Sequence, residues 1–110
     1  MSQSRRMDTL TRLEQIIAAR RNAAPESSYV AQLNAKGIAK IAQKLGEEAT
    51  EAVIAALSGS RQELVGESAD VLFHLLVLLG AKEIPLADVL AELDRRKGVS
   101  GLDEKASRRE

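Results

Sequence analysis

Apolar residues recur along this chain at the three- and four-residue spacing of α-helices. The clearest run lies between residues 38 and 56 and consists of Ile38, Ile41, Ala42, Leu45, Ala49, Ala52, Val53 and Ala56. Such a stripe is typical of a helix that buries one face. The run ends at Gly59, after which Ser60 and Glu63 form a capping box for a following helix. The pattern therefore predicts a hairpin of two antiparallel helices.

The second helix of this hairpin becomes apolar on every side toward its end. Its predicted core stripe consists of Leu64, Val71, Leu72, Leu75, Leu78 and Leu79. Phe73, Leu76 and Val77 point away from that stripe at helical spacing. A chain of 110 residues has too little other structure to cover all these side chains. We therefore expect a homodimer, in which a second copy covers the remaining face.

Shorter helices are predicted on both sides of the hairpin. Asp8 is the expected N-cap of a first helix whose inward face carries Leu10, Leu13, Ile16 and Ile17. Ser28 is expected to cap a short second helix that ends near Gly37. Pro85 suits the first turn of a last helix, which ends at Lys97 and directs inward Leu86, Val89, Leu90 and Leu93.

The predicted fold class is all-α, a helical bundle with a central antiparallel helix hairpin that is completed by dimerisation. We assign residues 1–110 to a single domain, because one domain usually takes about 100–200 residues. Residues 1–6 and about 99–110 are polar, and we expect both ends to be flexible.

Composition narrows the class of protein. One Phe, one Tyr and no Trp leave an aliphatic core, which favours helices over sheets. A net charge of zero argues against non-specific binding of nucleic acid, and the lack of cysteine excludes disulfides and thiolate chemistry. The longest apolar run, Val71–Leu79, is too short to span a bilayer, and no signal peptide is recognisable. We expect a cytoplasmic protein with no membrane partner.

Four carboxylates occupy matching positions on the two helices of the hairpin. Glu51 lies eight residues before Gly59 and Glu67 eight after it, while Glu48 and Asp70 lie eleven before and eleven after it. With a rise of about 1.5 Å per residue, both pairs reach the same heights on antiparallel helices. Carboxylates facing one another need a cation between them, and Mg²⁺ prefers oxygen ligands. The spacing therefore predicts a magnesium site.

Further charged residues lie near this predicted site. Lys40 and Lys44 lie one turn apart on the same flank, where their ammonium groups can bind phosphate. Glu47 turns further from the stripe and is either an accessory acid or a solvent-facing residue. His74, one turn after Asp70, either contacts the substrate or a carboxylate, or is a buried histidine hydrogen-bonded within the bundle; the pattern favours the buried histidine.

The acidic motifs belong to longer stretches that resemble a known family. The stretch SYVAQLNAKGIAKIAQKLGEEATEAVIAAL, followed by ELVGESADVLFHLLVLL, resembles the phosphoribosyl-ATP pyrophosphohydrolases, which are MazG-like all-α nucleotide pyrophosphohydrolases. The E-E-x-x-E and E-x-x-D motifs of that superfamily are both intact here. More specific are Ser28 with Tyr29, the run from Lys44 to Glu48, and the spacing from Asp70 to His74. The terminal segment from Ser100 to Ala106 also resembles tails of this family. The resemblance covers roughly residues 28–107.

The resemblance implies Mg²⁺-dependent hydrolysis of phosphoribosyl-ATP to phosphoribosyl-AMP and pyrophosphate, the second step of L-histidine biosynthesis. It implies that Mg²⁺ is bound by Glu48, Glu51, Glu67 and Asp70. Lys40 and Lys44 would hold the triphosphate, and Glu47 or Glu51 would act as the base. Members are commonly dimers, and many are fused to the cyclohydrolase that acts next. Because 110 residues leave no room for that domain, we expect a separate phosphoribosyl-AMP cyclohydrolase.

Two other functions remain open at this point. A housekeeping pyrophosphohydrolase that removes unwanted nucleoside triphosphates would share the fold, the metal and the reaction. A helical dimerisation module without catalytic activity would carry the same carboxylates as a solvated face with weak ion pairs.

Overall fold

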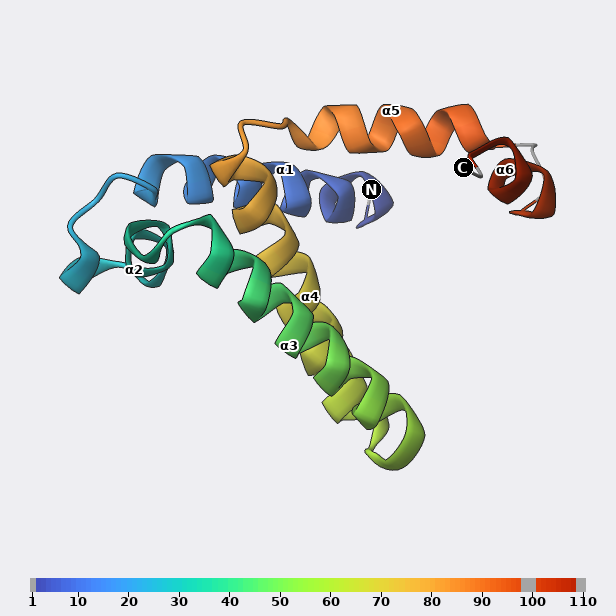
Figure 1. Cartoon of the computed structure of the whole chain (residues 1–110), viewed down its shortest axis with the longest axis horizontal. Helices are drawn as coiled ribbons and strands as arrows, with labels where there is room; N and C mark the ends of the chain where they lie inside the picture. The colour runs from blue at the N-terminus through green and yellow to red at the C-terminus, as the bar shows by residue number, and fades with distance from the viewer. Residues whose placement is uncertain (1, 98–100, 109–110) are drawn as a thin grey trace.

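The computed structural model describes residues 2–97 and 101–108, and these residues contain six α-helices and one 3-10 turn (Figure 1). The elements are α1 (Ser2–Arg20), η1 (Pro25–Ser27), α2 (Tyr29–Lys36), α3 (Ile38–Ser58), α4 (Arg61–Ala81), α5 (Leu86–Arg96) and α6 (Gly101–Arg108). The predicted all-α class is therefore confirmed. Met1, residues 98–100 and residues 109–110, which include parts of both predicted flexible ends, lie outside the described residues.

The antiparallel pair α3 and α4 is the central feature of the fold, and its far end projects away from the other helices (Figure 1). The predicted capping box is present at the turn between them. The backbone N–H of Glu63 donates to Ser60 Oγ over 3.1 Å, and the backbone N–H of Ser60 donates to Glu63 Oε1 over 2.7 Å. Because both contacts satisfy amide donors that a helix start leaves free, they fix where α4 begins.

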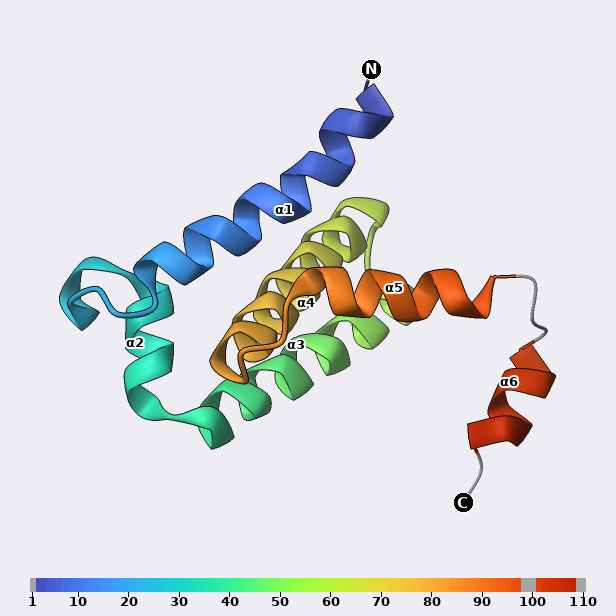
Figure 2. The same ribbon diagram turned by 90° about the horizontal axis from the view of Figure 1, so that it is seen from above.

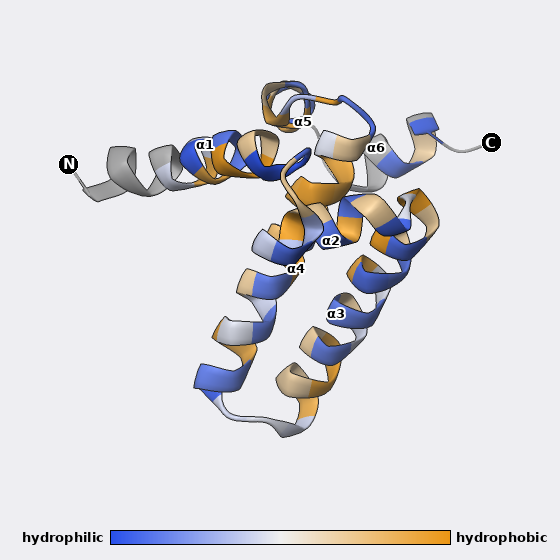
Figure 3. Cartoon of the chain, turned by 90° about the vertical axis from the view of Figure 1, so that its left-hand side faces the viewer, coloured by the Kyte–Doolittle hydropathy of each residue, from blue (hydrophilic) through white to orange (hydrophobic). Residues whose placement is uncertain are grey.

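The core lies at the opposite end of the hairpin, where α1 and α2 meet α3 and α4. Its buried members are Ile17, Val30, Leu33, Ile41, Leu76, Val77 and Leu86. Figure 2 shows α1 and α5 on the same side of this junction, with α2 connecting α1 to α3. Figure 3 shows hydrophobic positions that continue from the junction along the hairpin. The hairpin therefore keeps apolar side chains that this core does not bury.

The predicted core stripe of α4 is only partly right: Leu78 and Leu79 pack against the core, but Leu72 does not, and the most deeply buried residues lie outside the stripe. The buried residues there are His74, Leu76 and Val77, whereas Leu72 is 47% exposed. The reason is that α1 packs against α4 on the side away from α3, and this contact selects which side chains are buried. Helical spacing alone gives the faces of a helix, but it does not say which neighbour covers each face.

Several predicted boundaries also change. Helix α1 begins at Ser2 rather than after Asp8, and α6 occupies most of the predicted C-terminal tail. Pro85 is the N-cap of α5 rather than part of its first turn. Leu93 is 53% exposed and does not face inward, since α5 contacts the rest of the described chain mainly near its start at the buried Leu86.

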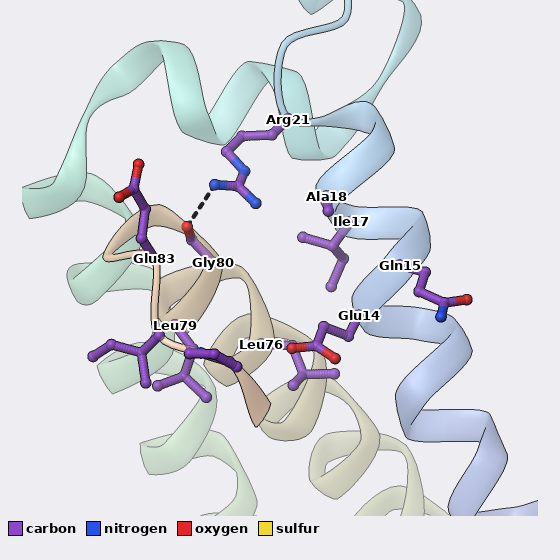
Figure 4. Close-up of a pocket in the computed structure, with 11 residues that line it drawn as sticks. Glu14, Gln15, Ile17, Ala18, Arg21, Leu76, Leu79, Gly80 and Glu83 are labelled. Carbon is purple, nitrogen blue, oxygen red and sulfur yellow. Dashed lines mark hydrogen bonds between the residues drawn. The ribbon is translucent and has the colours of Figure 1, made fainter. Parts of the chain in front are cut away.

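Glu14 of α1 and Arg21, directly after α1, fix the connection from α4 to α5; Figure 4 shows both side chains. Arg21 Nη1 donates to the carbonyl oxygen of Gly80 over 2.6 Å, near the end of α4. A Glu14 carboxylate oxygen accepts from the backbone N–H of Leu86 over 2.7 Å, at the start of α5. A positive group at a helix end and a negative group at a helix start both match the helix dipole. A cavity of about 350 Å³ lies between these contacts.

Helix α4 is long and apolar enough to cross a membrane, judged by length and composition alone. The run Val71–Leu79 is only part of this helix, so the shortness of that run does not decide whether α4 could span a bilayer. Only 17% of the apolar window is buried within the described chain, although α4 packs against both α3 and α1.

Gly37, which joins α2 to α3, has a backbone conformation that other residues rarely adopt, with φ 98° and ψ 169°. We expect Gly37→Ala to lower the free energy of unfolding by about 1–3 kcal/mol, because a Cβ is strained in this region. Gly46→Ala is the matched control: it lies inside α3 with open space around its Cβ position, and should raise stability by about 0.5–1 kcal/mol. Urea unfolding of both variants measures the change in the free energy of unfolding. Equal changes in the two variants would contradict the strained backbone conformation at Gly37.

Candidate functional site: an acidic cluster on the helix hairpin

Three of the four predicted carboxylates converge between α3 and α4. Carboxylate oxygens of Glu48, Glu67 and Asp70 all lie within 4.8 Å of one another. Glu51 is not part of this group of three, but it lies against Glu67 and influences its titration. The matched heights along the two helices thus bring the carboxylates together as the spacing predicts.

The cluster carries negative charge that the described residues compensate only in part. Burial raises the pKa of the Glu67 carboxyl, and the neighbouring charges of Glu51, Glu48 and Asp70 raise it further. Glu67 Oε1 is buried and has no hydrogen-bond partner among the described residues. Glu48 is only 9% exposed. Buried carboxylate oxygens without donors fit a hard divalent cation, which prefers such ligands.

Lys44 is the cation that contacts this cluster directly. Its ammonium group lies 3.7 Å from Glu48 Oε2 and 3.5 Å from Glu47 Oε1. The nearby Tyr29 raises the pKa of Lys44 most, and Glu47 and Glu48 add to the effect. Lys40, one turn earlier, is partly buried, and its charge reaches Glu47. Both lysines therefore lie on one flank of the cluster.

Glu47 lies on this flank and is not one of the three converging carboxylates. Gln43 Nε2 donates to Glu47 Oε2 over 2.9 Å, and this hydrogen bond is the largest cause of the lowered pKa of Glu47. Lys44 lowers the pKa further. The side chain is exposed, as the sequence analysis expected for a solvent-facing residue.

His74 is buried and both of its ring nitrogens have partners. Nδ1 lies 2.8 Å from the backbone carbonyl oxygen of Asp70, and Nε2 lies 3.1 Å from the Tyr29 hydroxyl. A carbonyl only accepts, so Nδ1 carries the proton and donates to it. His74 is therefore the buried, hydrogen-bonded histidine that the pattern favoured, and one of its partners is the backbone of a cluster residue.

Sequence reasoning assigned no role at this site to Tyr29 or Gln43. Gln43 gave no signal beyond lying one turn before Glu47. Tyr29 offered one, because it is the only tyrosine of a chain that contains a single Phe and no Trp. Its position beside the cluster depends on the turn at Gly37, whose geometry the sequence does not give.

Glu51 lines two shallow hollows on the hairpin, of which the first also touches the cluster at Glu67. One, of about 300 Å³, lies near the hairpin turn and is lined by Glu51, Ile54, Ala55, Ser58, Gly59, Glu63 and Glu67. The other, of about 640 Å³, is lined by Gln43, Gly46, Glu47, Thr50, Glu51 and Ile54. Glu51 therefore connects the buried carboxylates to space that a ligand can enter.

Comparison with known proteins points to one family, by the matching family model and by highly similar relatives alike. Residues 10–97 match the family model described as "Phosphoribosyl-ATP pyrophosphohydrolase", a range that contains every candidate site residue. The chain is 72% identical over 102 residues to a phosphoribosyl-ATP pyrophosphatase of Erythrobacter litoralis, covering 93% of this chain and 98% of that protein. It is 67% identical over 101 residues to the protein of that name in Novosphingobium aromaticivorans, covering 92% and 94%. For Rhizorhabdus wittichii the identity is 66% over 100 residues, covering 91% and 94%.

Removing one charge from the cluster should stabilise the metal-free protein. We expect Glu67→Gln to raise the thermal unfolding midpoint in EDTA, because the carboxylate that is crowded by Glu51, Glu48 and Asp70 becomes neutral. Glu26→Gln, at an exposed position in η1, should leave the midpoint unchanged. Differential scanning calorimetry compares the three proteins. A lower midpoint for Glu67→Gln would show that its charge is compensated.

Proposed function

The chain belongs to the phosphoribosyl-ATP pyrophosphohydrolase family, and we propose that its acidic hairpin hydrolyses phosphoribosyl-ATP to phosphoribosyl-AMP and pyrophosphate. This reaction is the second step of histidine biosynthesis, and the enzyme is a phosphoribosyl-ATP diphosphatase of the cytoplasm. The observation that carries the assignment to this site is the convergence of Glu48, Glu67 and Asp70 within 4.8 Å. We also propose that a separate protein, a phosphoribosyl-AMP cyclohydrolase, carries out the next step.

The proposed cofactor is Mg²⁺, held by Glu48, Glu67 and Asp70 with Glu51 beside them. The buried, unpartnered Glu67 Oε1 and the three crowded oxygens support this, since an all-oxygen set suits Mg²⁺. When bound, Mg²⁺ neutralises phosphate oxygens and activates water for attack on phosphorus.

Lys44 and Lys40 are proposed to hold the triphosphate beside this site. The ammonium group of Lys44 lies 3.7 Å from Glu48. Phosphate oxygens held by a metal ion at the carboxylates would therefore come within its reach. Phosphoryl transfer depends mainly on positioning and on stabilising the charge of the transition state. Two cations on one flank supply both, because they fix the triphosphate and offset its developing charge.

Of the two glutamates that the sequence left open as general base, we propose Glu51. It lies against Glu67 and lines both hollows, so it can reach a water beside the bound phosphates. Glu47 is held by Gln43 and Lys44, which lower its pKa and make it a weaker base. His74 would act indirectly, since its hydrogen bond to the Asp70 carbonyl restrains the backbone of a metal ligand.

We further propose that the protein is a homodimer joined through the hairpin. The exposed large apolar side chains of α3 and α4 are Ile38 (45%), Val53 (58%), Ile54 (55%), Leu57 (82%), Val65 (57%) and Leu72 (47%). Apolar residues at this density on one pair of helices mark an interaction surface. A second hairpin would cover it and would also bury the apolar helix α4 without a membrane.

The first test is pyrophosphate release from phosphoribosyl-ATP by the purified protein, with Mg²⁺ and then with EDTA. We expect rapid release that EDTA abolishes. Asp70→Asn and Glu51→Gln should lose nearly all turnover while keeping their helix content by circular dichroism, because the first removes a proposed metal ligand and the second the proposed base. Asp94→Asn is the control, since Asp94 pairs with Lys97 at the surface of α5.

The outcomes of this assay separate the alternatives. Cleavage of ordinary triphosphates but not of phosphoribosyl-ATP would indicate the housekeeping activity. Near-normal turnover in both Asp70→Asn and Glu51→Gln would reject the proposed site. A protein inactive on every substrate would be compatible with a dimerisation module.

The dimer can be tested separately by sedimentation equilibrium. One chain has a mass of 11.9 kDa, and we expect the wild type to sediment with twice this mass. Ile54→Asp should shift the equilibrium to monomer, because a charge would be buried in an apolar interface. Gln32→Glu, an exposed change on α2, should leave the dimer intact. A monomeric wild type would contradict the proposal.

A further inference from the structure

The single Tyr, the single Phe and the single His of this chain lie together. The sequence contains one Tyr, one Phe, one His and no Trp, and these three side chains are neighbours between α2 and α4. The rings of Tyr29 and Phe73 are stacked, with centroids 6.1 Å apart and planes at 22°. His74 meets both edge-on, at 5.8 Å from Tyr29 and 5.1 Å from Phe73. These distances are typical of interacting aromatic pairs.

This aromatic cluster lies between the acidic site and the core, against which Phe73 packs. His74 lies one helical turn after Asp70 and hydrogen-bonds to its carbonyl oxygen over 2.8 Å. Tyr29 lies on the flank of Lys44, whose ammonium group is 3.7 Å from Glu48. The tyrosine is therefore next to both the cation that would hold phosphate and the helix that carries the metal ligands.

The orientation of the Tyr29 ring is fixed. Because His74 Nδ1 donates to a carbonyl, Nε2 of the neutral ring accepts, and the Tyr29 hydroxyl is its donor over 3.1 Å. Phe73 packs against one face of the Tyr29 ring. Tyr29 is nevertheless 45% exposed. The side chain is thus held by its hydroxyl and by Phe73 while part of its surface stays open to solvent.

We propose that the open face of Tyr29 stacks against the purine ring of the substrate. The inference rests on the proposed function, because it takes the triphosphate to be held at the acidic cluster and the lysines. Aromatic faces bind bases by stacking with little dependence on which base is present. Adenine then lies on the α2 side of the site, and Tyr29 is a binding residue for the nucleoside part of the substrate.

The chain provides a specific optical test, because Tyr29 is its only tyrosine and it has no tryptophan. Tyrosine emission of the whole enzyme therefore reports on this ring alone. The probe is an ATP analogue with a methylene group in place of the oxygen between the α- and β-phosphorus atoms, which is not hydrolysed there. With Mg²⁺, we expect this analogue to quench the emission, after correction for absorbance with free tyrosine amide. Inorganic tripolyphosphate, which has no base, should bind without quenching.

Substitutions then separate the ring from its hydroxyl. Tyr29→Leu should weaken binding of the analogue about 10-fold or more in calorimetry, since stacking on one base contributes about 1–3 kcal/mol. Its affinity for Mg²⁺ with tripolyphosphate should stay unchanged. Tyr29→Phe keeps the ring and loses the hydrogen bond to His74, so it should restore most of the affinity for the analogue. In turnover, Tyr29→Leu should raise KM more than it lowers kcat.

Other results would overturn the inference. Equal weakening of both ligands by Tyr29→Leu would mean that Tyr29 only supports the fold of the site. Unquenched emission with the analogue bound would mean that the ring does not contact the base. If the wild type bound neither the analogue nor tripolyphosphate and released no pyrophosphate, the proposed function itself would fail, which is a distinguishable outcome.

Discussion

The mutual repulsion of the carboxylates between α3 and α4 is the constraint on which the rest of the structure depends. Three of them lie within 4.8 Å, and one of their oxygens is buried without a partner. Helix packing has to hold them there in the absence of a cation, so part of the stability of the fold is used to keep a charged site assembled. Lys44 offsets some of the charge from one side only. The remaining charge is what makes the cluster suited to a divalent cation.

The packing that resists this repulsion is concentrated at the two ends of the hairpin. A capping box fixes the turn between α3 and α4, and the apolar junction with α1 and α2 fixes the other end. The acidic cluster lies between them, where small residues and carboxylates replace a core. A proposed second hairpin would support this middle section from outside, which explains why its apolar residues remain exposed in one chain.

Side-chain hydrogen bonds also connect the acidic site to the apolar junction. His74 joins the backbone of Asp70 to the hydroxyl of Tyr29, and so ties α4 to the start of α2. The sharp connection at Gly37 allows α2 to turn back far enough for this contact. The same residues that close the core therefore determine what a ligand meets beside the carboxylates.

The sequence by itself determined the all-α class, the hairpin with its capping box, and the carboxylates at matching heights, because helical periodicity, capping and rise per residue are local properties. It also supplied the family, since the acidic motifs and the more specific residues around them are stretches of sequence that can be recognised without a structure. Only the tertiary structure decided which face of α4 is buried, that Glu47 pairs with Gln43 and Lys44 while Glu51 lies beside Glu67, and that Tyr29 reaches His74. These features depend on how α1 and α2 pack against the hairpin, and contacts between residues far apart in the sequence leave no periodic signal in it.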